Sequence, residues 1–191
     1  MKKLVSLVVV ALLFAGAAFG QRKAAPPPST YERDAKMLAY NPNWKKDFPN
    51  LKKFEVLAPS TPKNKKGAYN CIAHTVRVYT RWVWPGDRLS DFDALYGKAG
   101  FRRVKGLDYR FDPRVEKIVL YAKVKQDGTL SCTHGCKQLA DGTWTSKLGA
   151  GPLIRHHNPN SVNGPSYGRP VYVYVRKRAA PIFRPSPSPR T

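Results

Sequence analysis

Two Asp-Gly dipeptides in the second half of the chain strongly limit what it can fold into. Asp127-Gly128 and Asp141-Gly142 are hairpin signals, because glycine readily adopts the left-handed backbone that tight turns require. They separate three segments of strand character, at 116–124, 129–139 and 143–148. Alternation over 171–175 predicts a final strand. Strands joined by short turns are antiparallel neighbours, so the sequence predicts an antiparallel sheet.

Helical patterns come before these strands. Residues 31–40 predict a short helix with Thr30 as a possible N-cap. Apolar residues recur at helical spacing over 71–83, although this segment is rich in β-branched side chains. Ser90 is expected to cap a further helix over 91–98, with Gly100 just past its end. Helices followed by an antiparallel meander predict an α+β fold, with N-terminal helices packed on the sheet.

The first twenty residues predict a secretory signal peptide. Lys2 and Lys3 precede an apolar run over 4–15, and small residues flank position 19. The run is shorter than the roughly 20 residues of a membrane span. We therefore expect cleavage, no transmembrane segment afterwards, and a secreted or periplasmic protein of the cell envelope.

The rest of the chain divides by composition into four parts. We expect a Pro-rich linker at 21–30 and an N-terminal extension at 31–68 that is mostly loop with a short helix. A single α+β domain follows at 69–178, and a disordered basic tail rich in Pro and Ser at 179–191.

The chain is strongly basic. It has 34 Lys+Arg against 12 Asp+Glu, a formal net charge of +22, and loss of Lys2 and Lys3 with the signal peptide would leave +20. Such an excess favours polyanionic partners such as wall polymers, anionic glycans, nucleic acid or lipid headgroups. An exported basic domain that binds an anionic envelope polymer without catalysis is therefore one hypothesis for the function.

The chain has three cysteines, Cys71, Cys132 and Cys136. An odd number leaves at least one thiol unpaired within the chain. Two residues four apart in a strand lie roughly 13 Å apart, so Cys132 and Cys136 can form a disulfide only if the segment bends. Alternation would place both on one strand face with His134, which is too few ligands for a usual zinc site. We expect neither a metal nor a cofactor.

Cys71 and His134 are the residues with the clearest potential for chemistry. Cys71 lies at the start of the first predicted domain helix, where free N–H groups and the helix dipole favour a thiolate. His134 lies on a later strand that could pack against that helix start. A cysteine with a histidine base is the minimum for covalent acyl transfer.

The residue that would orient His134 depends on the hairpin at Asp141-Gly142. A two-residue loop would place Thr145 and Lys147 on the face of His134, whereas a three-residue loop would place Ser146 there. Gln138, further along the strand, is another candidate. We favour Ser146 or Gln138, because a lysine ammonium cannot accept the imidazole proton.

Several segments resemble a family of small uncharacterised bacterial domains. They are Tyr69-Asn70-Cys71-Ile72-Ala73-His74, Trp82-Val83-Trp84-Pro85, Glu116-Lys117-Ile118-Val119-Leu120-Tyr121, Thr133-His134-Gly135-Cys136-Lys137-Gln138-Leu139 and Asp141-Gly142-Thr143-Trp144-Thr145-Ser146-Lys147-Leu148-Gly149. The resemblance covers roughly 69–174 and implies no activity.

More distantly, the layout is similar to the NlpC/P60 and related papain-like amidases. Those have a cysteine at a helix start, an apolar strand, a histidine on the next strand and a polar third residue about a dozen positions later. The corresponding positions are Cys71, the strand 118–121, His134, and Ser146 or Lys147. The resemblance implies a papain-like (NlpC/P60-like) arrangement. It also implies an exported cysteine hydrolase or amidase that acts on a peptide or cell-wall amide.

Overall fold

The computed structural model describes residues 29–179. The predicted signal peptide, nearly all of the linker and nearly all of the basic tail lie outside this range. The elements are α1 (Thr30–Tyr40), α2 (Pro42–Asp47), β1 (Phe54–Ala58), α3 (Cys71–Thr75), α4 (Leu89–Lys98), β2 (Arg102–Val104), β3 (Val115–Val124), β4 (Leu130–Gln138), β5 (Trp144–Lys147), β6 (Leu153–His156), the 3-10 helix η1 (Pro159–Val162) and β7 (Arg169–Lys177).

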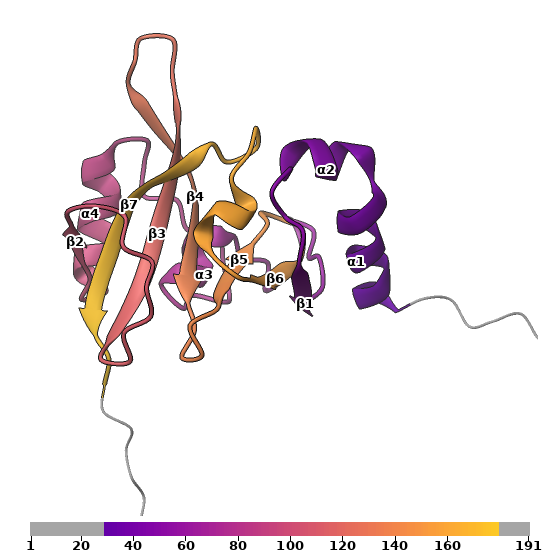
Figure 1. The fold of residues 1–191 in the computed structure, drawn as a ribbon, viewed down its shortest axis with the longest axis horizontal. Helices are drawn as coiled ribbons and strands as arrows, with labels where there is room; N and C mark the ends of the chain where they lie inside the picture. Colours follow the sequence, from indigo (N-terminus) through magenta and orange to yellow (C-terminus); the bar gives the residue numbers. More distant parts are fainter. Residues whose placement is uncertain (1–28, 180–191) are drawn as a thin grey trace, which may run out of the picture.

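All seven strands form one sheet in the order β1-β6-β5-β4-β3-β7-β2 (Figure 1). Every pairing in it is antiparallel. The predicted α+β class with an antiparallel sheet is therefore confirmed.

The sheet separates two hydrophobic cores. Along β3, Val119 and Tyr121 enter one core, while the alternate residues Ile118 and Leu120 enter the other. The first core also contains side chains from α1, η1 and the connection after α2, and the second contains side chains from α3 and α4. A strand buried on both faces loses the alternation of apolar and polar residues, which explains the continuous apolar run of β3.

The N-terminal segment has more regular structure than its sequence suggests. Asn41 caps α2 by accepting from the N–H of Asn43, and Pro42 occupies the first helical position, where its missing N–H costs nothing. β1 then pairs with β6 at the edge of the sheet. The extension at 31–68, expected to be mostly loop with a short helix, thus contains a second helix and a strand that complete the first core, to which Leu38 and Phe48 also contribute.

Three expected helix boundaries differ from those observed. Ser29 rather than Thr30 caps α1, in a reciprocal capping box with Glu32. α4 begins at Leu89, so Ser90 lies inside the helix instead of capping it.

The largest difference is at α3, which ends at Thr75 instead of continuing to position 83. Asn70 accounts for this. Its side-chain oxygen accepts from the N–H groups of Ala73 and Val83, both at 3.1 Å, and its amide donates to the carbonyl of Val83 at 2.9 Å. The chain must therefore turn back toward Asn70 after a short helix. Arg77, with φ of 63°, lies in that reversal.

A β-bulge in β4 changes which side chains share a face. Tyr121 pairs with His134 but Ala122 pairs with Cys132, so Thr133 is an extra residue in β4. Cys132 consequently enters the core under α3 and α4, while Cys136 enters the opposite core. The expectation that Cys132, His134 and Cys136 share one face is therefore wrong. All three cysteines are free thiols.

Gly135 is required by the close approach of α3 to β4. An added Cβ would lie 3.1 Å from Thr75 Cγ2, 3.1 Å from the Tyr96 hydroxyl and 3.2 Å from Ile72 Cδ1. We expect Gly135→Ala to lower the free energy of unfolding by about 1–3 kcal/mol, the usual cost of overpacking a core. Urea denaturation followed by circular dichroism measures this change.

The matched control is Gly97→Ala in α4, where an added Cβ meets nothing within 4 Å. This variant should be neutral or stabilised by up to about 1 kcal/mol, because alanine favours helix. If the two variants have equal free energies of unfolding, α3 does not pack against Gly135 of β4 as closely as described.

Candidate functional site

The β4–β5 hairpin has a three-residue loop. The N–H of Leu139 donates to the carbonyl of Thr143 at 2.8 Å, which leaves 140–142 as the loop. Asp141 stabilises it by accepting from the N–H of Thr143 at 2.9 Å. The register that follows places Ser146 on the face of His134, and Thr145 and Lys147 on the opposite face. Of the two registers considered from the sequence, the three-residue alternative is the observed one.

The His134 imidazole is fully buried and fixed on several sides. Its Nε2 lies 3.1 Å from Ser146 Oγ, whereas its Nδ1 has no hydrogen-bond partner. The ring of Tyr167 lies flat against it, with centroids 3.9 Å apart and planes 5° apart, and the Tyr121 ring meets it edge-on at 5.2 Å. Burial lowers the pKa of His134 well below its usual range, and the neighbouring His156 adds to this effect. The imidazole is therefore neutral at neutral pH.

The hydrogen-bond chain continues from Ser146 to β6. Ser146 Oγ lies 2.9 Å from His156 Nε2, and His156 Nδ1 lies 2.8 Å from the carbonyl oxygen of Asn158. Ser146 is completely buried, and His156 nearly so. Sequence reasoning did not find His156, because β6 was not expected. Residues 153–156 do not alternate between apolar and polar types, so the one available signal was the Gly- and Pro-containing break at 149–152 that precedes them.

Cys71 is the first residue of α3, and its side chain is buried. Its sulfur faces the backbone N–H of Gly135. Burial raises the pKa of the Cys71 thiol to about 11, outweighing the N–H groups around the sulfur and the charge of Lys147, which lower it. The position of Cys71 at a helix start had suggested a thiolate. Burial instead keeps the thiol protonated near neutral pH.

The backbone explains how the sulfur reaches β4. Pairing between β4 and β5 covers only Lys137↔Thr145 and Gln138↔Trp144, so Gly135 lies beyond it. We call the space past these pairs the β4–β5 opening. In an antiparallel ladder, every second residue directs its N–H toward the same neighbouring strand. The N–H of Leu139 donates to Thr143, so the N–H of Gly135, four residues away, is also directed toward the β5 side. There it lies near the Cys71 sulfur instead of a paired strand.

Cys71 belongs to the core under α3 and α4, whereas His134 packs against Tyr121 and Tyr167 of the opposite core. A strand N–H lies in the plane of the sheet, which places the Cys71 sulfur at the open side of β4. The His134 ring reaches Ser146 on β5. The side chains of Cys71 and His134 share no hydrogen bond. The link between them is the backbone of Gly135, the residue next to His134, which lies against the Cys71 sulfur.

Gln138, the other candidate for orienting His134, does not contact it. Its amide donates to the carbonyls of Tyr109 at 3.0 Å and Gly142 at 3.2 Å. Gln138 therefore ties the hairpin loop to a neighbouring segment, and Ser146 is the polar side chain that binds the imidazole.

Two further polar residues lie on the α3 side of β5. The Lys147 ammonium donates to the carbonyls of Gly149 and Gly151, and burial lowers its pKa to about 8. His74 Nε2 lies 2.9 Å from Thr145 Oγ1, and burial lowers the pKa of His74 to about 3. Lys147 thus holds the loop after β5, while His74 joins α3 to β5.

Within residues 29–179, no three His, Cys, Asp or Glu side chains gather in an arrangement that could hold a metal ion. No helix in that range combines the length and apolarity needed to cross a bilayer.

These features define a small α+β domain with a buried thiol in the core under α3 and α4 and a buried His134–Ser146–His156 chain on the opposite face of the antiparallel sheet. The chain belongs to the DUF7689 family, a domain of unknown function, whose family model matches residues 59–175. Membership of an uncharacterised domain family, expected from the sequence motifs, is thereby confirmed. No curated protein and no solved structure matches the chain.

The buried histidines predict a loss of stability in acid. Burial lowers the pKa of His156 to about 4 and that of His74 to about 3 in the folded state, and the usual value is 6.5. Below pH 6.5 the unfolded chain thus binds more protons, and each buried histidine removes up to about 1.4 kcal/mol of stability per pH unit down to its folded pKa. Urea denaturation between pH 7.5 and pH 4.5 measures this slope.

His156→Gln should flatten that slope, because it removes one group that takes up a proton on unfolding. The control is His157→Gln at the exposed neighbouring position, which should change the slope much less, because burial is the main cause of the lowered pKa of His156 and the charge of His157 a lesser one. Parallel curves for wild type and His156→Gln would contradict the prediction.

Proposed function

We propose that this chain is an exported papain-like cysteine hydrolase of the NlpC/P60-like kind, acting on a peptide or cell-wall amide. Cys71 is the nucleophile, His134 the general base and acid, and Ser146 the residue that orients the imidazole. The main supporting observation concerns the two ring nitrogens of His134. Nε2 is held by Ser146 and Nδ1 is left without a partner, while the Cys71 sulfur lies by the backbone of Gly135, the residue next to His134.

The protonation states suit a neutral pair. Burial raises the pKa of the Cys71 thiol and lowers the pKa of the His134 imidazole, so both are uncharged near neutral pH. The imidazole is then ready to accept a proton and the thiol still has one to give. Proton transfer would accompany attack, because a preformed thiolate–imidazolium pair would be costly in so buried a site.

The proposed reaction proceeds through a thioester. The Cys71 proton moves to His134 Nδ1 as the sulfur bonds to the amide carbonyl carbon. The Nδ1 proton then passes to the leaving nitrogen as the C–N bond breaks. Water, deprotonated by Nδ1, attacks the thioester, and that proton returns to the sulfur as the acid product leaves. The backbone N–H of Gly135 favours negative charge on the sulfur during these steps.

Substrate must reach a site that is closed in this structure. The Tyr167 ring covers one face of the imidazole, and it belongs to the connection between η1 and β7 rather than to a strand. That connection is closed by an isolated bridge between Gly164 and Gly168. We propose that it moves aside to admit a substrate, since connections outside the sheet open at lower free energy than the strands.

Export and charge fit the same proposal. A chain cut after position 20 acts outside the cytoplasmic membrane, and its net charge of +20 would hold it near an anionic envelope. The intact mass of the exported protein, expected to begin at Gln21, checks this part.

The nucleophile can be tested with Cys71→Ala. We expect the mature protein to release free amine from peptide amides or from purified wall peptides, and the variant to lose at least about 1,000-fold in rate because no other group in the site can form the thioester. Mass spectrometry of the products, and of Cys71 trapped with iodoacetamide, provides the measurement.

Cys132→Ala is the matched control, because Cys132 is also a buried free thiol in the core under α3 and α4 but does not begin a helix as Cys71 does. It should retain activity. Equal hydrolysis by Cys71→Ala, or no hydrolysis by the wild type on either substrate class, would rule out the proposal.

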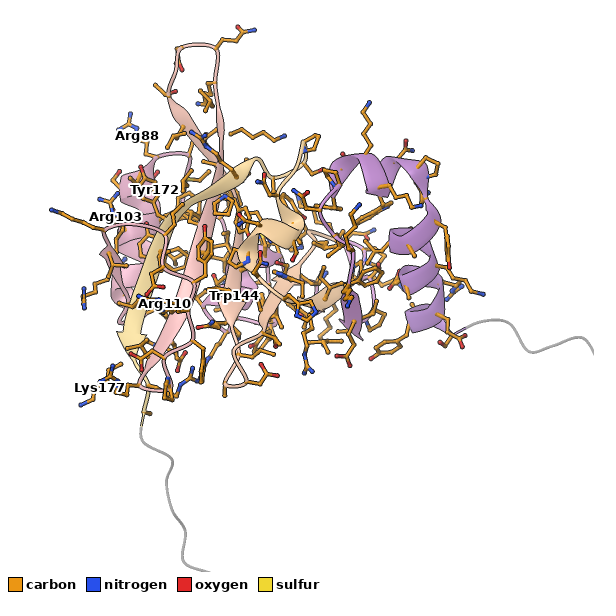
Figure 2. The ribbon with its side chains drawn as sticks, viewed as in Figure 1. Arg88, Arg103, Arg110, Trp144, Tyr172 and Lys177 are labelled. Carbon is orange, nitrogen blue, oxygen red and sulfur yellow. The ribbon has the colours of Figure 1, made fainter. Side chains whose placement is uncertain are left out.

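Exposed cationic side chains favour a second candidate, a non-catalytic domain that binds an anionic envelope polymer. Figure 2 shows Arg88, Arg103 and Tyr172 at the end of the molecule formed by α4, β2 and β7. The Arg103 guanidinium lies 4.9 Å from the centre of the Tyr172 ring, so it is already held in place at the surface. Arg110 and Lys177 are also exposed. A fixed arginine loses less entropy on binding an anion than a free one.

This second candidate predicts retention on an anionic polymer such as heparin that weakens steeply with salt, because binding releases condensed counterions. Retention should be the same for wild type and Cys71→Ala. It should fall for the double variant Arg88→Ala and Arg103→Ala. Retention that does not change between 50 mM and 500 mM NaCl would exclude the electrostatic mechanism.

A further inference from the structure

We propose that His156 is a positioning residue that selects the tautomer of His134 through Ser146. This inference rests on the proposed function, since it explains how Nδ1 of His134 is kept free to act as the base. It assigns a role to a residue that neither the sequence motifs nor the papain-like resemblance indicated.

The donor-to-acceptor direction of the hydrogen bonds that link His134, Ser146 and His156 is set at His156. The partner of His156 Nδ1 is the carbonyl oxygen of Asn158, at 2.8 Å. A carbonyl oxygen can only accept, so Nδ1 of His156 must have the proton. A neutral imidazole has one N–H, and Nε2 of His156 is then a bare acceptor.

The direction then passes through Ser146. Its hydroxyl has one proton, and at 2.9 Å from the bare Nε2 of His156 that proton is donated to His156. Ser146 Oγ has only lone pairs left for its second contact, with His134 Nε2 at 3.1 Å. His134 must therefore donate from Nε2, which leaves Nδ1 as a bare acceptor without a partner.

A serine needs such a partner because it is not a fixed acceptor. A side-chain amide or carboxylate oxygen can only accept, but a hydroxyl can either donate or accept. Without His156, the Ser146 hydroxyl would be free to donate to His134 Nε2. The His134 proton would then lie on Nδ1, where it would prevent this nitrogen from taking the proton of the thiol.

Burial and strand pairing keep the chain in one arrangement. Ser146 and His156 lie on β5 and β6, which are joined at four residue pairs, including Ser146↔Ile154 and Trp144↔His156. His134 and Ser146 are fully buried, so water does not compete for their hydrogen bonds. The direction fixed at Asn158 is therefore transmitted to His134 without an alternative partner.

The test is a direct measurement of the tautomer. Long-range ¹H–¹⁵N correlation spectra of protein labelled with ¹⁵N-histidine distinguish protonated from bare ring nitrogens. We expect wild-type His134 to be protonated at Nε2 and bare at Nδ1 at pH 7.5. Detection of an Nδ1 proton on His134 in the wild type would overturn the proposal.

Variants then test the role of His156. His156→Leu removes the acceptor and should move the His134 proton to Nδ1. His156→Gln keeps a carbonyl oxygen that can accept from Ser146 and should restore the Nε2 proton in most molecules. His157→Leu, at the exposed neighbouring position, should not change the spectrum. An unchanged His134 tautomer in His156→Leu contradicts the proposal.

The spectrum also separates this inference from the proposed function. If His156→Leu moves the proton, Cys71-dependent hydrolysis should fall by about 100-fold or more, the usual value of a general base, while His156→Gln retains most of it. A proton that moves in a protein without Cys71-dependent hydrolysis would support the tautomer selection and refute the enzyme. If hydrolysis depends on Cys71 but the His134 proton does not move in His156→Leu, the enzyme is supported and the tautomer selection is refuted.

Discussion

The short pairing between β4 and β5 is the constraint on which the candidate site depends. Past Lys137↔Thr145 the two strands no longer pair, and the N–H of Gly135 needs another acceptor. Cys71 supplies it with sulfur from the start of α3, and this is possible because residue 135 has no side chain to keep the helix away. β5 meanwhile remains paired with β6, so Ser146 and His156 stay in register. One opening in the sheet therefore admits the thiol, while the intact pairing next to it aligns the polar chain that holds His134.

The turn residues of the sequence predict much of the sheet. The Asp-Gly turns and the alternation around them identified β3, β4, β5 and β7, and they limited the partners of His134 to a few residues. They could not choose between a two-residue and a three-residue loop, because both suit Asp141-Gly142, and that choice decides whether Ser146 or its neighbours face His134. β1, β2 and β6 are about as short as β5, but they escaped prediction because no Asp-Gly turn adjoins them. They take their place mainly from pairing with strands that are already formed.

Other features depend on contacts between distant residues. The apolar spacing over 71–83 predicts a long helix, but the hydrogen bonds from Asn70 to Val83 end α3 after one and a half turns and override that local preference. The bulge at Thr133 has no counterpart in the pattern of the sequence, yet it decides that Cys132 and His134 face opposite cores. The protonation state of Cys71 is similar. Its position at a helix start suggests a thiolate, and only the packing around the sulfur shows that burial prevails.

Burial and charge act together on the protonation of the site. The basic side chains of Lys137 and Lys147 add to burial in lowering the pKa of His74, and Lys147 acts on Cys71 in the opposite sense, lowering a thiol pKa that burial has raised. Positive charge thus opposes an added proton on His74 and favours negative charge on the Cys71 sulfur. The part due to Lys147 is present below its own pKa of about 8. In the proposed mechanism, neutral His134 and neutral Cys71 separate charge only when a proton moves from sulfur to Nδ1, and the direction of the Ser146–His156 chain determines whether Nδ1 is free to receive it.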